Sequence, residues 1–308
     1  MTGRRLLLPR LIVGAGLLSL AGFGAFWLLT APRGLSEAEL AALPEGDPAR
    51  GETVFWAGGC ASCHAARGAT GEALLALGGG LELATPFGTF VAPNISSDPE
   101  DGIGSWSTGD LANAMLRGIS PEGAHYYPAF PYASYARMEP GDVADLRAYL
   151  ATLPAVAGKA ADHRLAFPYS LRRGIGLWQL AFLSSDPVVA VDEADPELVR
   201  GRYLVEGPGH CGECHTPRNF AGGLEMGRWL AGGPNPEGEG RIPDITPGGE
   251  LGEWSVGDIA YYLETGFTPE FDSVGGSMAA VQRNMSMLPA SDREAIAGYL
   301  KAVPASAP

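Results

Sequence analysis

The chain has 308 residues, a formal net charge of −14, and only 4 Cys beside 44 Gly and 25 Pro. Phosphate binding needs a basic face, so this acidic composition argues against a nucleic-acid partner. Four Cys cannot staple a chain of this length into a disulfide scaffold, and the length itself suggests about two domains.

A charge-free run of 20 residues, Leu11–Thr30, follows three Arg within the first ten positions. As a helix this run would measure about 30 Å, which matches the core of a bilayer. Basic residues before the run favour an inside N-terminus and an exported remainder. The alternative is a cleaved signal peptide, but Ala31-Pro32-Arg33 is a poor cleavage context. We expect residues 1–34 to be a single-pass anchor in the cytoplasmic membrane, with the remainder in the periplasm.

Landmarks of the remaining chain recur at a spacing near 150 residues. The seven matched pairs are Arg50-Gly51 with Arg200-Gly201, 60–64 (CASCH) with 211–215 (CGECH), 93–95 with 243–245, Trp106-Ser107 with Trp254-Ser255, Gly109-Asp110 with Gly257-Asp258, Gly118 with Gly266, and Tyr149-Leu150 with Tyr299-Leu300. This order predicts two domains of one fold, at 35–154 and 196–308, joined by a linker at 155–195.

Each predicted domain is helical. Asp47-Pro48 is typical of a helix start, and Gly58-Gly59 of its end. Further helices are expected from Ser107 to Gly118, from Asp142 to Leu150, and at the matching positions from Ser255 to Gly266 and from Ser291 to Leu300. No alternating apolar run is long enough to predict a sheet, so the expected class is all-α.

The sequence Cys-x-x-Cys-His occurs in both repeats and is the attachment signature of c-type haem. We expect Cys60, Cys63, Cys211 and Cys214 to form the thioethers of two covalently bound haems, and His64 and His215 to be the proximal iron ligands. Three other readings fit less well. Zinc knuckles would lie much closer together than the 147 residues between Cys63 and Cys211. A thioredoxin-like site needs a βαβ setting, and disulfides would not explain the His after each pair.

The sixth iron ligand is often Met, which should come from the segment before the last helix of each domain. In the first domain Met138 has this position, Met115 falls within an amphipathic helix and is expected in the core, and His125 is an alternative ligand. In the second domain Met278, Met285 and Met287 all qualify, whereas Met226 is too near the haem motif. Spacing alone leaves the choice among the three open.

The chain resembles the membrane-associated cytochrome c subunits of bacterial alcohol, gluconate, sorbitol, aldehyde and nicotinate dehydrogenases. The resemblance covers nearly all of residues 45–305. The stretches that carry it are 94–99 (NISSDP), 102–106 (GIGSW), 127–132 (YPAFPY), 142–150, 211–218 (CGECHTPR), 230–232 (LAG) and 275–278 (GGSM). It implies a pair of tandem class I cytochrome c domains behind the membrane helix.

The resemblance also bears on the ligands. Relatives with Phe at the place of Phe130 tend to carry Met at the place of Met138, and the Gly-Gly-Ser-Met pattern favours Met278, with Met285 and Met287 as alternates. Asn94, Trp106 and Trp254 recur in the family pattern either near the haem edges or in loop and core packing. Many relatives carry three haem motifs where this chain has two.

The linker holds an apolar stretch, 171–183, with two adjacent Arg, too short to span a bilayer. It either lies on the membrane surface, docks a partner subunit, or packs over the two haem domains. The surplus of acidic residues could steer a basic redox partner or simply be a solvated surface.

These features predict a membrane-anchored dihaem cytochrome c that is an electron-transfer protein with no catalytic residue of its own. Electrons would pass one at a time from a periplasmic dehydrogenase subunit to quinone, an oxidase or another cytochrome of the respiratory chain. The alternatives are a dihaem enzyme, such as a peroxidase or a thiosulfate dehydrogenase, and a cytochrome subunit of a terminal oxidase.

Overall fold

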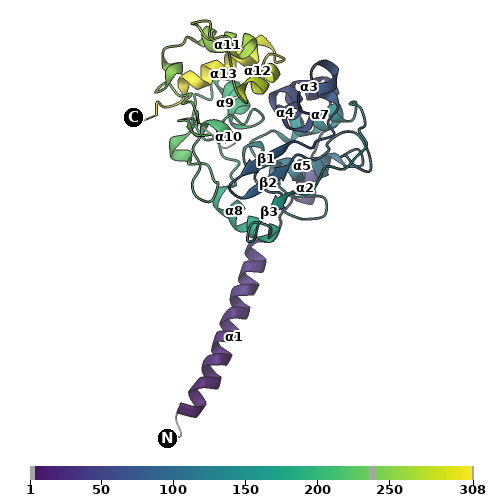
Figure 1. Ribbon diagram of the computed structural model, residues 1–308, viewed down its shortest axis with the longest axis vertical. Coiled ribbons are helices and arrows are strands. Elements are labelled where there is room, and N and C mark those ends of the chain that lie inside the picture. The colour runs from purple at the N-terminus through teal and green to yellow at the C-terminus, as the bar shows by residue number, and fades with distance from the viewer. Residues whose placement is uncertain (1–3, 236–239, 307–308) are drawn as a thin grey trace.

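The computed structural model describes residues 4–235 and 240–306 (Figure 1). The first three residues of the expected anchor and the last two of the expected second domain lie outside the described residues. A long helix, α1 (Arg4–Leu29), extends away from a globular head. Its segment Ile12–Leu29 is long and apolar enough to cross a membrane, and none of it is buried against the head. The helix predicted for this run is therefore confirmed.

The first half of the head, residues 35–154, is built mainly from helices. They are α2 (Glu37–Ala41), α3 (Pro48–Ala57), α4 (Cys60–His64), α5 (Thr108–Arg117), α6 (Tyr132–Tyr135) and α7 (Pro140–Leu150), with a 3-10 turn at Gly71–Leu75. Helix α3 packs across α7, and α5 packs on α7. The Asp47 side chain accepts from Ala49 N and so caps α3, as the sequence predicts.

The second half, residues 196–308, repeats this arrangement and forms the upper left part of Figure 1. Its helices are α9 (Pro196–Glu206), α10 (Gly212–His215), α11 (Val256–Thr265), α12 (Met278–Met285) and α13 (Ala290–Ala302), with 3-10 turns at Met226–Arg228 and Glu250–Gly252. Helix α9 packs across α13, and α11 packs on α13.

The matching helices α5 and α11 begin and end in the same way. Ser107 and Ser255 each form a capping box with the Asp three residues later, and Gly118 and Gly266 end the helices in the left-handed conformation. Both devices satisfy backbone groups that a helix end leaves unpaired. These predicted caps are confirmed.

Glycine permits the close crossing of helices in both halves. A Cβ on Gly51 would lie 2.0 Å from the Asp145 carbonyl oxygen, and one on Gly201 would lie 1.9 Å from that of Ala295. No larger residue fits at such a distance without moving a helix, which explains why Arg-Gly recurs in the repeat.

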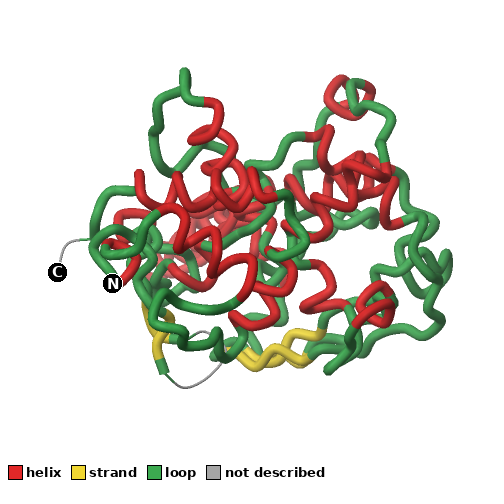
Figure 2. Tube along the Cα trace, turned by 90° about the horizontal axis from the view of Figure 1, so that it is seen from above, coloured by secondary structure: helices red, strands yellow, loops and turns green. Residues whose placement is uncertain are grey.

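The expectation of an all-α fold is wrong in detail, because the head is mostly helical but contains two small sheets. Strands β1 (Glu82–Thr85), β2 (Gly88–Val91) and β3 (Arg164–Leu165) form one, and β4 (Gly233–Pro234) pairs with β5 (Arg241–Ile242) in the other. Figure 2 shows helices through most of the head and strands confined to one side of it. The strands have four residues or fewer, too few for an alternating pattern to be recognised, and β3 comes from the distant linker.

The linker, residues 155–195, joins the halves and returns to the base of the head. After β3 it forms a 3-10 turn, Arg172–Gly174, and then α8 (Ile175–Phe182). In Figure 1 α8 and β3 lie at the base of the head, near the end of α1. The linker therefore contacts the first half, the second half and the N-terminal helix.

Candidate functional site

Each Cys-x-x-Cys-His motif forms a short helix directly after the first long helix of its half. Cys60–His64 is α4, which follows α3 through Gly58 and a left-handed Gly59 with φ +59°. In the second motif the left-handed position belongs to His210, with φ +39°, directly before Cys211. A sharp turn thus connects each motif to the helix that precedes it.

The two motif histidines are oriented by equivalent hydrogen bonds. His64 Nδ1 donates to the Pro93 carbonyl oxygen at 2.8 Å, and His215 Nδ1 donates to that of Pro243 at 2.9 Å. Because the carbonyls take Nδ1–H, Nε2 is left as the lone-pair nitrogen that can bind a metal. Burial lowers the pKa of both imidazoles, which keeps them in the neutral form that ligates iron.

The motif cysteines do not resemble thiolate ligands. Burial, with a smaller contribution from the neighbouring motif thiol, raises the pKa of Cys60 and of Cys211 to about 12. Such a thiol stays protonated while nothing is bound to it. Within residues 4–235 and 240–306, no group of three or more His, Cys, Asp and Glu is placed to hold a metal ion. Each motif thus offers two thiols and one imidazole, the set that covalent haem attachment uses, without, among the described residues, the fourth ligand that a structural zinc site needs.

The candidate distal ligands differ in burial. Met138 is buried and precedes α7, and its Cγ would lie 3.6 Å from a Cβ placed on Gly207 of the second half. Met278 is half-buried at the start of α12, and Met285 is buried at the end of the same helix. Met287 is 54% exposed.

The backbone shows which residue of the second half occupies the place of Met138. Met138 N donates to the Tyr135 carbonyl oxygen before α7, and Leu288 N donates in the same way to that of Met285 before α13. Leu288 is thus the counterpart of Met138, and the second half carries no Met there. A distal Met in the second half would have to come from another position, and Met278, Met285 and Met287 are the candidates.

Five other residues that the sequence singled out make contacts within the fold. Met115 is in the core, as expected. His125 is buried and its Nε2 donates to the Thr30 carbonyl oxygen at 2.8 Å, which ties it to the end of α1. Asn94 is buried and its Nδ2 donates to the carbonyl oxygens of Val156 and Gly158, so it holds the linker. Trp106 and Trp254 are partly buried, and their carbonyls accept from Arg147 and Lys301.

Sequence reasoning missed that each motif is bound by the other half of the molecule. Asn284 Nδ2 donates to Ser62 Oγ of the first motif at 2.7 Å, and Ser134 Oγ donates to Glu213 of the second motif at 2.8 Å. The contacts are reciprocal, because Asn284 and Ser134 both lie in the segment that precedes the last helix of their half. Nothing in the repeat pattern signals which residues meet between its copies.

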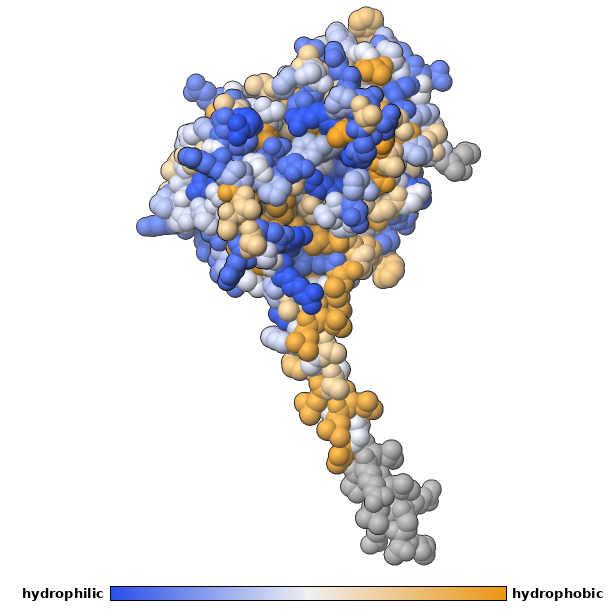
Figure 3. Space-filling model, turned by 180° about the vertical axis from the view of Figure 1, so that it is seen from behind, coloured by the Kyte–Doolittle hydropathy of each residue, from blue (hydrophilic) through white to orange (hydrophobic). Residues whose placement is uncertain are grey.

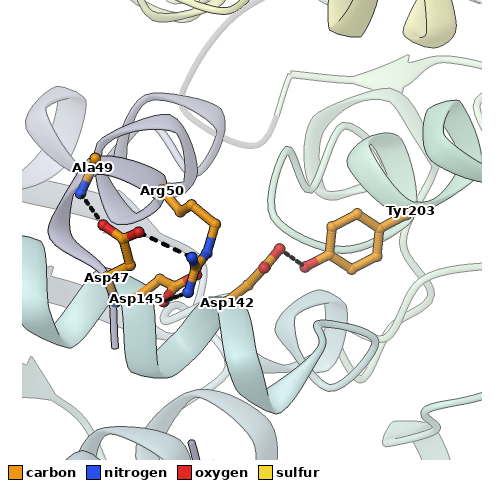
Figure 4. A network of polar contacts seen from close by, with 6 residues as sticks. All are labelled: Asp47, Ala49, Arg50, Asp142, Asp145 and Tyr203. Carbon is orange, nitrogen blue, oxygen red and sulfur yellow. Dashed lines mark hydrogen bonds and ion pairs between the residues drawn. The ribbon is translucent and has the colours of Figure 1, made fainter. Parts of the chain in front are cut away.

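Two further contacts join the halves. His210 Nε2 donates to the Gly58 carbonyl oxygen at 3.2 Å, which links the turns that precede the two motifs. Tyr203 on α9 donates to Asp142 on α7 at 2.5 Å (Figure 4). The starts of both motifs therefore lie at the contact between the halves, an arrangement that suits electron transfer from one to the other.

Comparison with known proteins identifies one relative that matches nearly the whole chain and others that match most of it. A family model for cytochrome c matches residues 48–154. A dihaem c-type cytochrome of Cereibacter sphaeroides is 57% identical over 295 residues, which cover 96% of this chain and 98% of the relative.

Two further relatives are subunits of dehydrogenases. The fructose dehydrogenase cytochrome subunit of Gluconobacter japonicus is 37% identical, with 84% of this chain and 53% of the relative covered. The cytochrome c subunit of the quinone-dependent alcohol dehydrogenase of Gluconobacter oxydans is also 37% identical, with 83% and 54% covered. The chain thus spans about half the length of these two subunits.

Proposed function

We propose a specific place in electron transfer for this chain, which belongs to the family of dihaem c-type cytochromes related to the cytochrome subunits of membrane-bound bacterial dehydrogenases. The protein carries two covalently bound haem c groups. Our proposal is that it accepts electrons one at a time from a periplasmic dehydrogenase and passes them to quinone, an oxidase or another cytochrome. The observation that carries the proposal is that the two haem-attachment motifs begin at the contact between the halves, where each motif is hydrogen-bonded to the other half.

The haems supply one-electron iron chemistry, and the chain's residues hold and tune it. We propose that Cys60 and Cys63 attach one group and that His64 and Met138 ligate its iron. Cys211 and Cys214 attach the other, with His215 and Met278 as ligands. Pro93 and Pro243 support this assignment, because their carbonyl oxygens orient the imidazoles and raise their basicity.

We also propose that the halves 35–154 and 196–308 are separate cytochrome c domains with one haem each. The support is that each half has its own crossing of first and last helix, α3 with α7 and α9 with α13, around its own motif. One test removes a single attachment site. The variant C60A/C63A should retain one haem per chain, attached to Cys211 and Cys214. Loss of both haems from correctly folded protein would contradict two independent sites.

Residues 1–34 are proposed to anchor the protein as a single-pass helix with the head in the periplasm. The support is the exposed apolar length of α1 and the kinship to subunits of membrane dehydrogenases. Haem attachment to Cys-x-x-Cys-His on the head then takes place on the same side as the dehydrogenase. A free N-terminus on the cytoplasmic side, shown by protease protection in spheroplasts, is the expected result. A mature protein that begins after residue 31 would show cleavage instead.

The decisive experiment is purification from native membranes in mild detergent with identification of the copurifying subunits by mass spectrometry. We expect a dehydrogenase catalytic subunit in stoichiometric amount. Adding its substrate to the membranes should reduce both haems, as followed by their absorption. Copurification with oxidase subunits would overturn the proposed donor, and turnover of peroxide or thiosulfate by the isolated protein would identify an enzyme instead.

A further inference from the structure

The end of α1 is held tightly by the head. Thr30 is completely buried, and its carbonyl oxygen accepts from His125 Nε2 at 2.8 Å. Arg173 Nε donates to Thr30 Oγ1 at 3.0 Å, and Arg173 also donates to the Trp27 carbonyl oxygen and stacks over the Trp27 ring at 4.2 Å. A Cβ on Gly176 would lie 2.6 Å from Thr30 Cα, so α8 starts in contact with the end of α1. These contacts hold the end of α1 against the head.

Apolar side chains of the linker segment that contacts this junction face solvent. Leu171 is 57% exposed, Leu177 48% and Leu180 60%. Phe167 and Tyr169, just before them in the chain, are also exposed. Figure 3 shows the hydrophobic surface continuing from α1 onto the base of the head. We refer to these five exposed residues as the basal collar.

Helix α8 packs against the head through one face and leaves the collar residues on its other face exposed. Trp178 Nε1 donates to the Ala221 carbonyl oxygen, and Gln179 Nε2 donates to that of Arg117. These inward side chains hold the loop after the second haem motif and the end of α5. Leu177 and Leu180, three residues apart on one helix face, are left pointing outward.

Charge distinguishes the collar segment from the rest of the protein. Residues 163–185 contain three Arg and neither Asp nor Glu, in a chain whose net charge is −14. Arg172 is exposed in this segment, and Arg173 contacts the end of α1. An apolar surface with Arg at its edge and Trp at the adjoining helix end is the composition that suits the boundary between lipid tails and headgroups.

We propose that the basal collar rests in the headgroup region of the membrane that α1 crosses, and that it fixes the orientation of the head. Its occupant is an anionic lipid surface. This inference rests on the proposed anchor, because continuity with α1 is what brings the collar to the bilayer. Since α8 also holds the loop after the second motif, contact with lipid would set the position of that motif relative to the membrane.

The test uses the full haem-loaded chain in nanodiscs of phosphatidylethanolamine and phosphatidylglycerol that contain a diazirine-bearing lipid. Labelled peptides are mapped by mass spectrometry after illumination. We expect label in α1 and in residues 165–183. The variant L171S/L177S/L180S should retain label in α1 and lose it from 165–183 by about tenfold or more, because the exposed apolar surface there is removed.

The matched control is V256S/Y261S, which removes exposed apolar side chains from α11 at the opposite end of the head. It should leave both labelled regions unchanged, and unchanged haem spectra should show that both variants are folded. Label in α1 without label in 165–183 would overturn the collar proposal alone. Absence of label from both would overturn the anchor as well. Equal labelling of the collar without phosphatidylglycerol would exclude anionic lipid as its occupant.

Discussion

The two halves share one helix crossing but secure it with different ion pairs. Arg50 Nε donates to Asp145 at 2.7 Å, whereas Arg200 Nε donates to Asp292 at 2.9 Å. Counted back from the matched Tyr-Leu pairs, Asp292 corresponds to Asp142, and the place of Asp145 is taken by Ala295. The acidic partner has thus moved by about one helical turn between the copies.

This shift changes what the halves can offer each other. Asp142 is free of Arg50 and accepts from Tyr203 of the second half, as Figure 4 shows. Its counterpart Asp292 is occupied by Arg200. Thr53, the counterpart of Tyr203, therefore meets no equivalent acceptor, and a hollow of about 340 Å³ lies beside it. The two copies thus share the helix crossing, whereas the hydrogen bond between the halves is made in only one of the two equivalent positions.

The largest effect on stability is expected at the glycine that both halves have where their first and last helices cross. Gly51→Ala and Gly201→Ala should each lower the free energy of unfolding by about 3 kcal/mol or more, because the new methyl overlaps a backbone carbonyl that cannot move independently. Thermal unfolding of the haem-loaded protein measures this. Gly298→Ala on α13 is the control, since its Cβ would have ordinary contacts, and it should be neutral or slightly stabilising. Equal effects at positions 201 and 298 would contradict the crossing argument.

The next prediction concerns the distal iron ligands, which we propose to come from different positions in the two halves. Met138→Ala and Met278→Ala should each abolish the far-red Met–iron absorption of one haem and lower its potential by on the order of 100 mV. Met285→Ala should preserve both absorptions and cost about 2–5 kcal/mol of stability, because Met285 is a buried core residue. Redox titration with absorption spectra makes the distinction. A lost absorption in Met285→Ala, with both retained in Met278→Ala, would move the ligand to Met285.

Local features of the fold could be predicted from the sequence, whereas contacts between distant segments could not. The Cys-x-x-Cys-His motifs, the caps at Ser107 and Ser255 and the crossing helices follow from local residue patterns, and the structure has those helices and caps. The reciprocal bonds of Ser134 and Asn284 do not follow, because hydrogen bonds between distant segments leave no periodic signal. Strand β3 was missed for the same reason, since two residues of the linker form it by pairing with β2.

The sequence alone also leaves open whether Met278, Met285 or Met287 is the distal iron ligand of the second half. Insertions between α11 and α13 change the spacing of the second half, so counting residues from the first half cannot identify the ligand. In the structure Leu288 lies where Met138 lies in the first half, and Met278, Met285 and Met287 differ in burial.

A smaller effect tests the ion pairs that differ between the halves. Burial would raise the pKa of Asp145, but the Arg50 guanidinium and the Asp47 N–H more than offset it, so the pKa is lowered from 3.8. The stability that the ionised Asp145 contributes is therefore present above pH 3.8 and is lost as the pH falls through the lowered value.

Asp145→Asn should accordingly cost about 2 kcal/mol at neutral pH, and the difference from the parent protein should shrink in acid. Denaturant unfolding over a pH series measures this. Asp292→Asn is the matched variant in the second half, and it should cost less because Asp292 is less buried and lacks the additional backbone donor that Asp145 binds. A cost for Asp145→Asn that stays constant down to the acid limit would show that packing rather than charge stabilises the site.

The smallest effect on stability is expected for the Tyr203–Asp142 contact, which only one half makes. Tyr203→Phe removes the hydroxyl that donates to Asp142 and retains the ring, so it should destabilise the protein by about 1–2 kcal/mol, as expected for a hydrogen bond to a charged acceptor. Thr53→Val, the same loss of a hydroxyl at the counterpart position, should change stability by less than about 0.5 kcal/mol, because no cross-half acceptor faces it. Both values come from chemical denaturation of the haem-loaded protein. A double variant Tyr203→Phe with Asp142→Asn should cost less than the sum of its single changes, since each removes the same bond. Strict additivity would mean that Tyr203 stabilises the junction through its ring, and the asymmetry between the halves would then be one of packing.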